Sequence, residues 1–352
     1  MNRYIKLFLL FLGGINAALI GRSLLRPTDT SLPQLTARWA CNTSKSYTIV
    51  DSHLEEYPLF LVYNENYFNR HRLPSDEINY RYDEQQSVLG SHLNHLIEKL
   101  LAEIKTCKKK YSDFILLQDK DFNHKKAAGL AVFRFKDYPF ILKLFIETPK
   151  SFVHPWMKGV LPVWFFYMGG GTNRHITGLT RIQNMLVIRN KLCDMPKWSA
   201  FVDTPRKWFW TPKNLKMIEL IGHNIGDKEQ LTACIPGTYA IIADAIEEAT
   251  EKTIFDQHRR KIALELCNTL DLFIDPHIDN FMIEKETHKL VIIDTEHFPT
   301  LVGLKRKVSY KTYVRWYLGL MHKATYDIFF RNKKERKEAQ LIKSNLNLFE
   351  YC

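Results

Sequence analysis

The stretch LELCNTLDLFIDPHIDNFMIEKETHKLVIIDTEHF, residues 264–298, decides the fold. Apolar residues at the i, i+4, i+8 and i+11 spacing of a helix packed on a core lead into it, namely Ile262, Leu266, Leu270 and Phe273. Pro276 favours an extended Asp275, so the helix is predicted to end near Asp271 and to be followed by a loop.

Two short apolar runs follow this loop, at residues 281–283 and 289–293, with polar residues 284–288 between them. Short apolar runs separated by a few polar residues are typical of a tight hairpin. Asp294 comes directly after the second run, so we expect its carboxylate at the end of a strand.

Helix, polar loop, hairpin and Asp in this order resemble the catalytic segment of the protein-kinase-like superfamily. Asp275, Asn280 five positions later, and Asp294 after the two strands match that family's pattern. His277 makes the loop most similar to the aminoglycoside phosphotransferase and choline-kinase-like branch. The resemblance implies that Asp275 orients the attacking hydroxyl, that His277 belongs to the same catalytic loop, and that Asn280 and Asp294 hold Mg²⁺.

The segment also departs from the family. Phe273 stands where the family has His, and Thr295 and Glu296 follow Asp294 where protein kinases have Phe and Gly. Neither departure removes a metal ligand. In the alternative interpretation, Asp275 and Asp294 only cap turns.

Three strands are expected upstream, at residues 114–117, 128–135 and 140–146. Lys143 is the one charged residue in the apolar run of the third strand. An unpaired buried charge is costly, so Lys143 needs a partner unless it points outward from an edge strand. The resemblance implies that Lys143 binds the phosphates of a nucleotide.

Other parts of the expected nucleotide site depart from the family pattern. Residues 118–126 are expected to form a loop without the family's glycine-rich sequence, and the helix expected up to Arg189 has no Glu to pair with Lys143. We expect the last small-lobe strand at 216–221, a hinge at 222–226, and helices at 239–249 and 257–270.

Composition sets broader bounds. The chain has 352 residues, of which 45% are hydrophobic and 13% aromatic, enough to bury a large core. Lys and Arg number 50 against 38 Asp and Glu, a net charge of +12, which favours anionic partners or is simply a basic surface. The sequence contains no zinc-finger spacing and no RNA-binding signature, so no specific nucleic-acid binding is expected. The six cysteines include no Cys-x-x-Cys pair, which argues against structural zinc.

The N-terminus begins with Arg3 and Lys6 and continues with an apolar run to Ile20. This is the outline of a signal peptide, and the run is shorter than the roughly 20 residues of a membrane span. An uncleaved anchor is the alternative, so the protein is expected to be exported or membrane-associated through residues 1–20.

The predicted architecture is α+β: a bilobal protein-kinase-like fold with an antiparallel sheet in the small lobe and a mainly helical large lobe. The expected parts are a signal peptide or anchor (1–21), a linker (22–47), a helical extension (48–111), a small nucleotide-binding lobe (112–226) and a large catalytic lobe (227–352).

The expected function is an ATP- and Mg²⁺-dependent phosphotransferase that acts on a hydroxyl of a small molecule, a lipid-linked sugar or a protein. One alternative is a membrane-associated binding or scaffold protein that keeps the fold without turnover. Another is an acid/base hydrolase that uses Asp275, Asp279 and Glu296.

Overall fold

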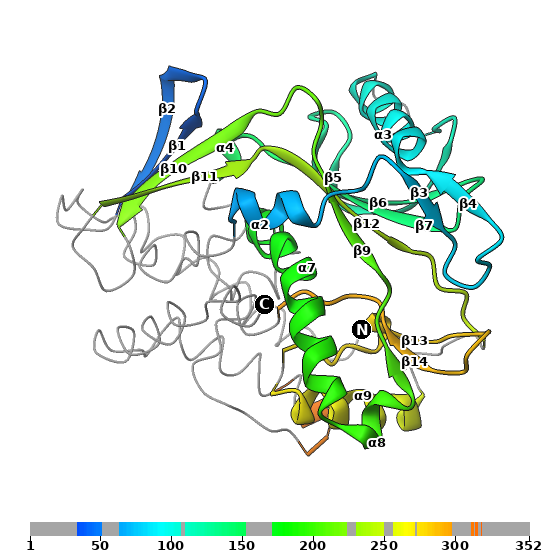
Figure 1. Ribbon diagram of the computed structural model, residues 1–352. Helices are drawn as coiled ribbons and strands as arrows, with labels where there is room; N and C mark the ends of the chain where they lie inside the picture. Colours follow the sequence, from blue (N-terminus) through cyan, green and yellow to red (C-terminus); the bar gives the residue numbers. More distant parts are fainter. Residues whose placement is uncertain are drawn as a thin grey trace, which may run out of the picture.

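The computed structural model has a mixed α+β fold whose sheets are mainly antiparallel, as predicted (Figure 1). The structure describes residues 34–50, 63–106, 110–152, 171–223, 230–249, 256–271, 273–297, 311–312, 314–315 and 318. The expected signal or anchor, residues 1–21, lies outside these ranges. Within them, no helix has the length and apolar character needed to cross a membrane.

A five-stranded antiparallel sheet, with strand order β5-β6-β7-β12-β9, forms the roof of the site described below. Its strands are β5 (Phe114–Asn123), β6 (Ala128–Phe135), β7 (Phe140–Ile146), β9 (Lys207–Trp210) and β12 (Thr238–Asp244). The bounds predicted for β6 and β7 are confirmed. The loop expected at 118–126 is wrong in extent, because β5 continues to Asn123.

The helix expected at residues 239–249 is wrong, because β12 lies in the middle of the sheet, between β7 and β9. Tyr239 and Ile241 pack on one side of this strand and Ala240 and Ile242 on the other, and all four are buried. A strand buried on both faces is a continuous apolar run, which periodicity alone does not separate from a buried helix.

Side-chain alternation gives the two faces of the sheet different roles. Phe140, Leu142 and Leu144 of β7 share a core with α3 (Gly90–Lys105), a helix inside the segment expected as a helical extension, 48–111. Lys143 and Phe145 face the other side. There α7 (Gly171–Cys193) lies across the sheet (Figure 1).

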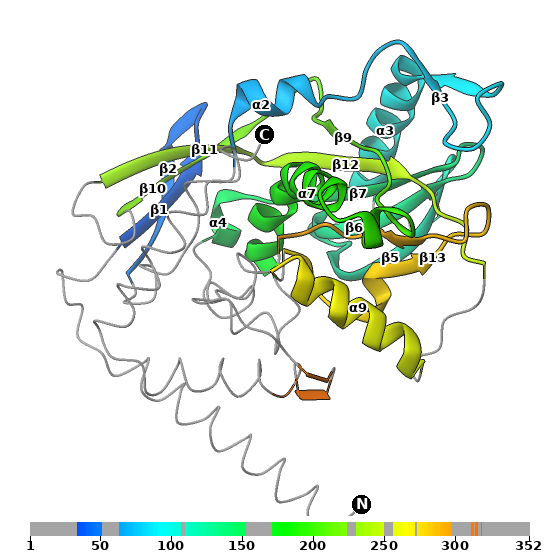
Figure 2. The same cartoon turned by 60° about the horizontal axis from the view of Figure 1, so that its bottom comes forward.

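The long helix α7 connects two cores, in agreement with the helix predicted up to Arg189. Its first half buries Ile176, Leu179 and Ile182 against the sheet. Its second half buries Val187, Ile188 and Leu192 in a core with α9 (Gln257–Thr269). In Figure 1 α7 runs down toward α9, and in Figure 2, where α7 is seen nearly end-on, α9 lies below it. A side chain in the middle of α7 is therefore held between the two cores.

Gly178 lets α7 approach the sheet closely. A Cβ atom at this position would lie 2.6 Å from Cε1 of Phe145 and would also collide with the Tyr239 hydroxyl. Both rings are buried and stacked on each other, with centroids 4.6 Å apart, so neither has room to move.

We expect Gly178→Ala to lower the free energy of unfolding by about 1–3 kcal/mol, because the added methyl overpacks a filled core. Alanine alone would favour the helix by about 1 kcal/mol relative to glycine. Urea unfolding followed by circular dichroism measures the balance. An increase in stability would contradict the close contact between α7 and the sheet.

A second, four-stranded sheet has the order β11-β10-β1-β2. It contains β1 (Gln34–Trp39), β2 (Asn42–Val50), β10 (Met217–His223) and β11 (Gln230–Pro236). Two expectations are corrected here. Residues 34–47 form a hairpin and not a linker, and the strand expected at 216–221 exists but belongs to this second sheet.

The hinge expected at 222–226 is therefore wrong in position, since Gly222 is paired with Leu35 and Leu231 inside this sheet. Residues 224–229 lie outside the described ranges. β12, the last strand of the five-stranded sheet in chain order, ends at Asp244.

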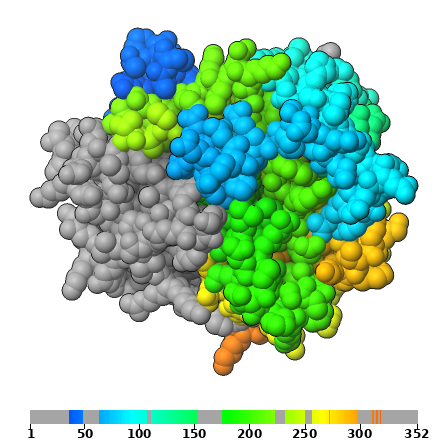
Figure 3. Space-filling model, viewed as in Figure 1, coloured from blue at the N-terminus to red at the C-terminus, as the bar shows by residue number. Residues whose placement is uncertain are grey.

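The remaining elements are the helix α9, the β13–β14 hairpin and several short helices and strands. The helix predicted at 257–270 is confirmed as α9, and the hairpin as β13 (Phe281–Ile283) and β14 (Leu290–Ile292). The short elements are α2 (Glu65–Arg70), β3 (Glu77–Asn79), β4 (Ser87–Leu89), α4 (Pro149–Phe152), α8 (Pro196–Ser199), β8 (Val202–Asp203) and the 3-10 turn η2 (Ile278–Asn280). In the space-filling view α2 lies against α7, where Tyr67 and Phe68 join its core (Figure 3).

Candidate functional site

A cavity of about 690 Å³ lies between the five-stranded sheet and the segments on either side of the β13–β14 hairpin. Its roof comes from β5, β6, β7, β9 and β12, and its floor from the loop before β13 and the residues after β14. All five residues that the sequence singled out line this cavity: Lys143, Asp275, His277, Asn280 and Asp294. The fold thus gathers residues that are up to 151 positions apart in the chain.

The predicted loop before β13 is held in place by hydrogen bonds between its side chains and its backbone. The His277 N–H donates to Asp275 Oδ1 at 2.9 Å, and Asn280 Nδ2 donates to the Asp275 carbonyl at 3.2 Å. Ile293 N–H donates to the Asn280 carbonyl at 2.9 Å, which ties the loop to the end of β14. The His277 side chain is 44% exposed, so it lies at the open side of the cavity.

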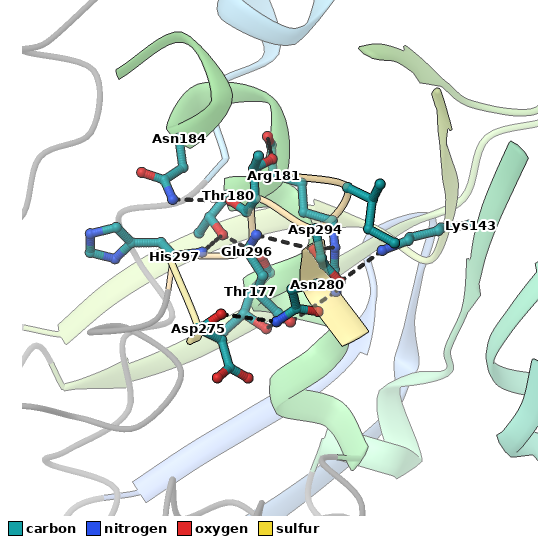
Figure 4. A network of polar contacts seen from close by, with 12 residues as sticks. Lys143, Thr177, Thr180, Arg181, Asn184, Asp275, Asn280, Asp294, Glu296 and His297 are labelled. Carbon is teal, nitrogen blue, oxygen red and sulfur yellow. Dashed lines mark hydrogen bonds and ion pairs between the residues drawn. The ribbon is translucent and has the colours of Figure 1, made fainter. Parts of the chain in front are cut away.

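Lys143 has the partner that its apolar strand required. Its Nζ lies 2.7 Å from Asp294 Oδ2, so the ion pair connects the roof of the cavity to its floor (Figure 4). Lys143 is on an inner strand, which rules out the alternative of an outward-facing lysine on an edge strand.

Arg181, in the middle of α7, is the residue that the sequence analysis missed. Its Nε donates to Asp294 Oδ1 at 2.8 Å and its Nη2 to Asp294 Oδ2 at 3.2 Å. Nη2 also donates to Glu296 Oε2 at 2.8 Å, and the side chain is only 2% exposed (Figure 4). The sequence search looked for an acidic partner of Lys143 on this helix, whereas α7 supplies a second cation for Asp294.

The charges of this cluster determine its protonation. Burial alone would raise the pKa of Asp294, but the charges of Arg181, Lys143 and Lys207 outweigh burial and hold that pKa well below its usual value. Burial lowers the pKa of Lys143, although the Asp294 charge opposes this. Asp294 is therefore ionised and already neutralised by cations of the protein.

Lys207, on β9, is a further cavity residue that the sequence analysis did not identify. Its Nζ donates to Thr295 Oγ1 at 2.6 Å and to the Ile293 carbonyl at 3.3 Å. The sequence signal was present, because Lys207 comes directly before three aromatic residues in the run Lys-Trp-Phe-Trp, residues 207–210. That run was not recognised as a strand.

The edge of the cavity near the end of β12 is fixed by a second ion cluster. Arg206 holds the buried Asp244 with two short contacts, of Nη2 to Oδ1 at 2.7 Å and of Nε to Oδ2 at 3.0 Å. Arg81, from the segment between β3 and β4, lies 3.9 Å from Asp244 and 3.3 Å from the buried Glu284 on the β13–β14 hairpin. Arg81 thus links the segment between β3 and β4 to the end of β12 and to the β13–β14 hairpin.

Asn280 and Asp294 can contribute an amide oxygen and a carboxylate to a hard cation. Mg²⁺ at nucleotide sites is commonly held by one or two carboxylates together with phosphate oxygens. Among the described residues, no group of three or more His, Cys, Asp or Glu side chains is arranged to hold a metal by itself. The donor set therefore fits an ion that arrives with phosphate oxygens, and it does not fit a metal bound by protein ligands alone.

Comparison with known families, with curated proteins and with solved structures gives no match to this chain. Function is therefore inferred from the residues and the geometry of the cavity.

Proposed function

We propose that this protein is a phosphotransferase with a bilobal, kinase-like fold that uses ATP and Mg²⁺ to phosphorylate a hydroxyl group. One observation carries the proposal: Lys143 on the third strand of a small antiparallel sheet meets Asp294 across a cavity that Asp275 and Asn280 also line. These residue types occur at these places in the order of the superfamily that the sequence resembles. A cavity of about 690 Å³ has the size of a small-molecule site.

In this mechanism Asp275 orients the acceptor hydroxyl and takes its proton. The hydroxyl oxygen forms a bond to the γ-phosphorus, while the bond from that phosphorus to the bridging oxygen breaks and ADP leaves. Lys143 binds phosphate oxygens from the roof, and Asn280 and Asp294 would hold Mg²⁺ from the floor. Mg²⁺, when bound, neutralises the phosphate charge. His277, at the open side, lies where an acceptor would enter.

The second candidate is a nucleotide-binding protein without turnover, and one observation favours it. Both carboxylate oxygens of Asp294 are already paired with Arg181, and Oδ2 also with Lys143. A cation bound by Asp294 would lie next to the guanidinium, and that repulsion weakens metal binding. Phosphate release from ATP separates the two candidates, because only the phosphotransferase turns over.

Nucleotide binding by the full chain is the first test. A ligand that binds only the folded state stabilises it by about 2.7 kcal/mol at 100 times its Kd, so ATP with Mg²⁺ is expected to raise the melting temperature. Lys143→Met should lose most of this shift, because it removes a cation that faces the phosphates.

Lys197→Met is the matched control, because Lys197 is a 74% exposed lysine on α8, outside the cavity. It should keep the full shift. Absence of a shift in the wild type at saturating ATP would contradict the proposed function.

A further inference from the structure

Lys207 is a buried lysine whose role the mechanism above does not use. It is 6% exposed and lines the cavity. On β12 its partner is Ala243, two residues after Ile241, which is the partner of Lys143. Lys143 and Lys207 therefore both reach from the roof toward residues 293–295 on the floor. They do so from two different strands.

The two lysines differ in their partners. Lys143 meets a carboxylate, whereas the acceptors of Lys207 among the described residues are the Thr295 hydroxyl and the Ile293 carbonyl. A lysine ammonium has three N–H donors, so one donor of Lys207 remains for another acceptor. Within the described ranges, no carboxylate lies within 4.0 Å of Lys207 Nζ.

In the described part of the chain, the charged groups that act on Lys207 include more cations than carboxylates. Lys143, Arg181 and Lys207 contribute three cations, and Asp294 and Glu296 contribute two carboxylates, which Arg181 and Lys143 already occupy. Burial without a counter-ion is costly for a charged group, and it holds the pKa of Lys207 well below its usual value. A charge that destabilises the empty protein is typical of a binding site.

Nothing in the roof offers the phosphates a glycine-rich backbone. The turn between β5 and β6, residues 124–127, contains no glycine, and Ala127 takes its positive φ of 45°. Among the described residues of the roof, side chains such as Lys143 and Lys207 are therefore the donors available to an anion. Of Lys143, Arg181 and Lys207, Lys207 is the one that has no carboxylate within ion-pair distance in the described part of the chain.

We propose that Lys207 is a second anion-binding residue of the cavity, which donates to an oxygen of the nucleotide's polyphosphate chain beside Lys143, and that Lys143 binds the same chain while it keeps its contact with Asp294. This inference rests on the proposed function and adds a residue to it. A linear polyphosphate has several charged oxygens along its length, so it can accept from both lysines at once. A ligand with a single carboxylate is too short to do so. Phosphate oxygens are good acceptors for the point charge of a lysine.

A purely structural role makes the opposite prediction for stability. If Lys207 serves only to clamp residues 293–295, Lys207→Met should lower the melting temperature of the protein without ligand. If Lys207 serves a ligand, methionine replaces an unpaired buried charge by an apolar chain of similar length. The melting temperature should then stay the same or rise.

The experiment measures binding of inorganic tripolyphosphate, and of ATP with Mg²⁺, to the full chain by titration calorimetry. Lys207→Met is expected to weaken tripolyphosphate binding by about 10-fold or more, the value of a hydrogen bond between charged groups. Lys120→Met is the control for the general field, because Lys120 is an exposed lysine at the rim of the same cavity. It should change the affinity by only about 2-fold.

Each outcome decides between the two roles. Weaker binding with an unchanged or higher melting temperature supports the inference. Unchanged affinity, or a lower melting temperature without ligand, overturns it. If Lys207→Met binds both probes like the wild type while Lys143→Met binds neither, this inference alone is wrong. If the wild type binds neither probe, the proposed function is wrong as well.

Discussion

Asp294→Asn is expected to lower the free energy of unfolding by about 3–5 kcal/mol and to abolish phosphate transfer. The substitution keeps the shape of the side chain but removes the charge that compensates Arg181 and Lys143. Arg181 is 2% exposed, so it has no access to water as a substitute partner. The guanidinium would retain only Glu296, and two buried cations would then repel each other.

Denaturant unfolding measures the stability, and phosphate release from ATP measures the transfer. The control is Asp113→Asn, because Asp113 forms an ion pair of similar length, 2.8 Å, with Lys99 on the surface. Exposed pairs contribute little, so this control should leave both measurements nearly unchanged. An Asp294→Asn protein as stable as the wild type would show that the cluster around Asp294 does not hold α7 to the floor of the cavity.

The sequence predicted the parts of the site that lie close together in the chain. The loop from Asp275 to Asn280 and the hairpin before Asp294 were recognisable because proline, polar turn residues and short apolar runs act locally. Lys143 was recognisable for a different reason, since a single charge in an apolar strand implies a partner. Its partner, Asp294, could be named only from the fold.

Other features depend on contacts between distant segments, which local patterns do not encode. The central position of β12 results from pairing with both β7 and β9, and its apolar run read alone suits a helix equally well. The hairpin of β1 and β2 was missed because it is mostly polar and exposed, and its main partner is β10, far along the chain. These two misses also explain why the expected hinge at 222–226 was wrong in position, because Gly222 is paired inside the second sheet.

Arg181 shows a limit of another kind. On α7 it is surrounded by apolar and neutral polar residues, and a helical arginine is ordinarily a surface residue. Only the fold brings it to Asp294 and Glu296, two residues that follow β14. The expected arrangement was a glutamate on this helix paired with Lys143. In the protein, Asp294 is instead the common partner of two cations, Lys143 on β7 and Arg181 on α7.

Asp275→Asn is expected to reduce the rate of phosphate transfer by about 10²–10⁴-fold while ATP binding stays close to that of the wild type. Asparagine keeps an oxygen that can accept from the His277 N–H, so the loop should keep its shape. It cannot take a proton from the acceptor hydroxyl. The loss should therefore appear in kcat and not in nucleotide affinity, which Lys143 and the floor residues determine.

Phosphate release from ATP measures this rate without knowledge of the acceptor, and calorimetry measures the affinity. Asp279→Asn is the matched control, because Asp279 belongs to the same loop, lines the same cavity and is 60% exposed. If both variants lose the same activity, the effect comes from the charge of the loop as a whole. If Asp275→Asn alone loses kcat at unchanged affinity, the proton acceptor is Asp275. Equal rates in Asp275→Asn and the wild type would leave the cavity as a binding site without the proposed chemistry.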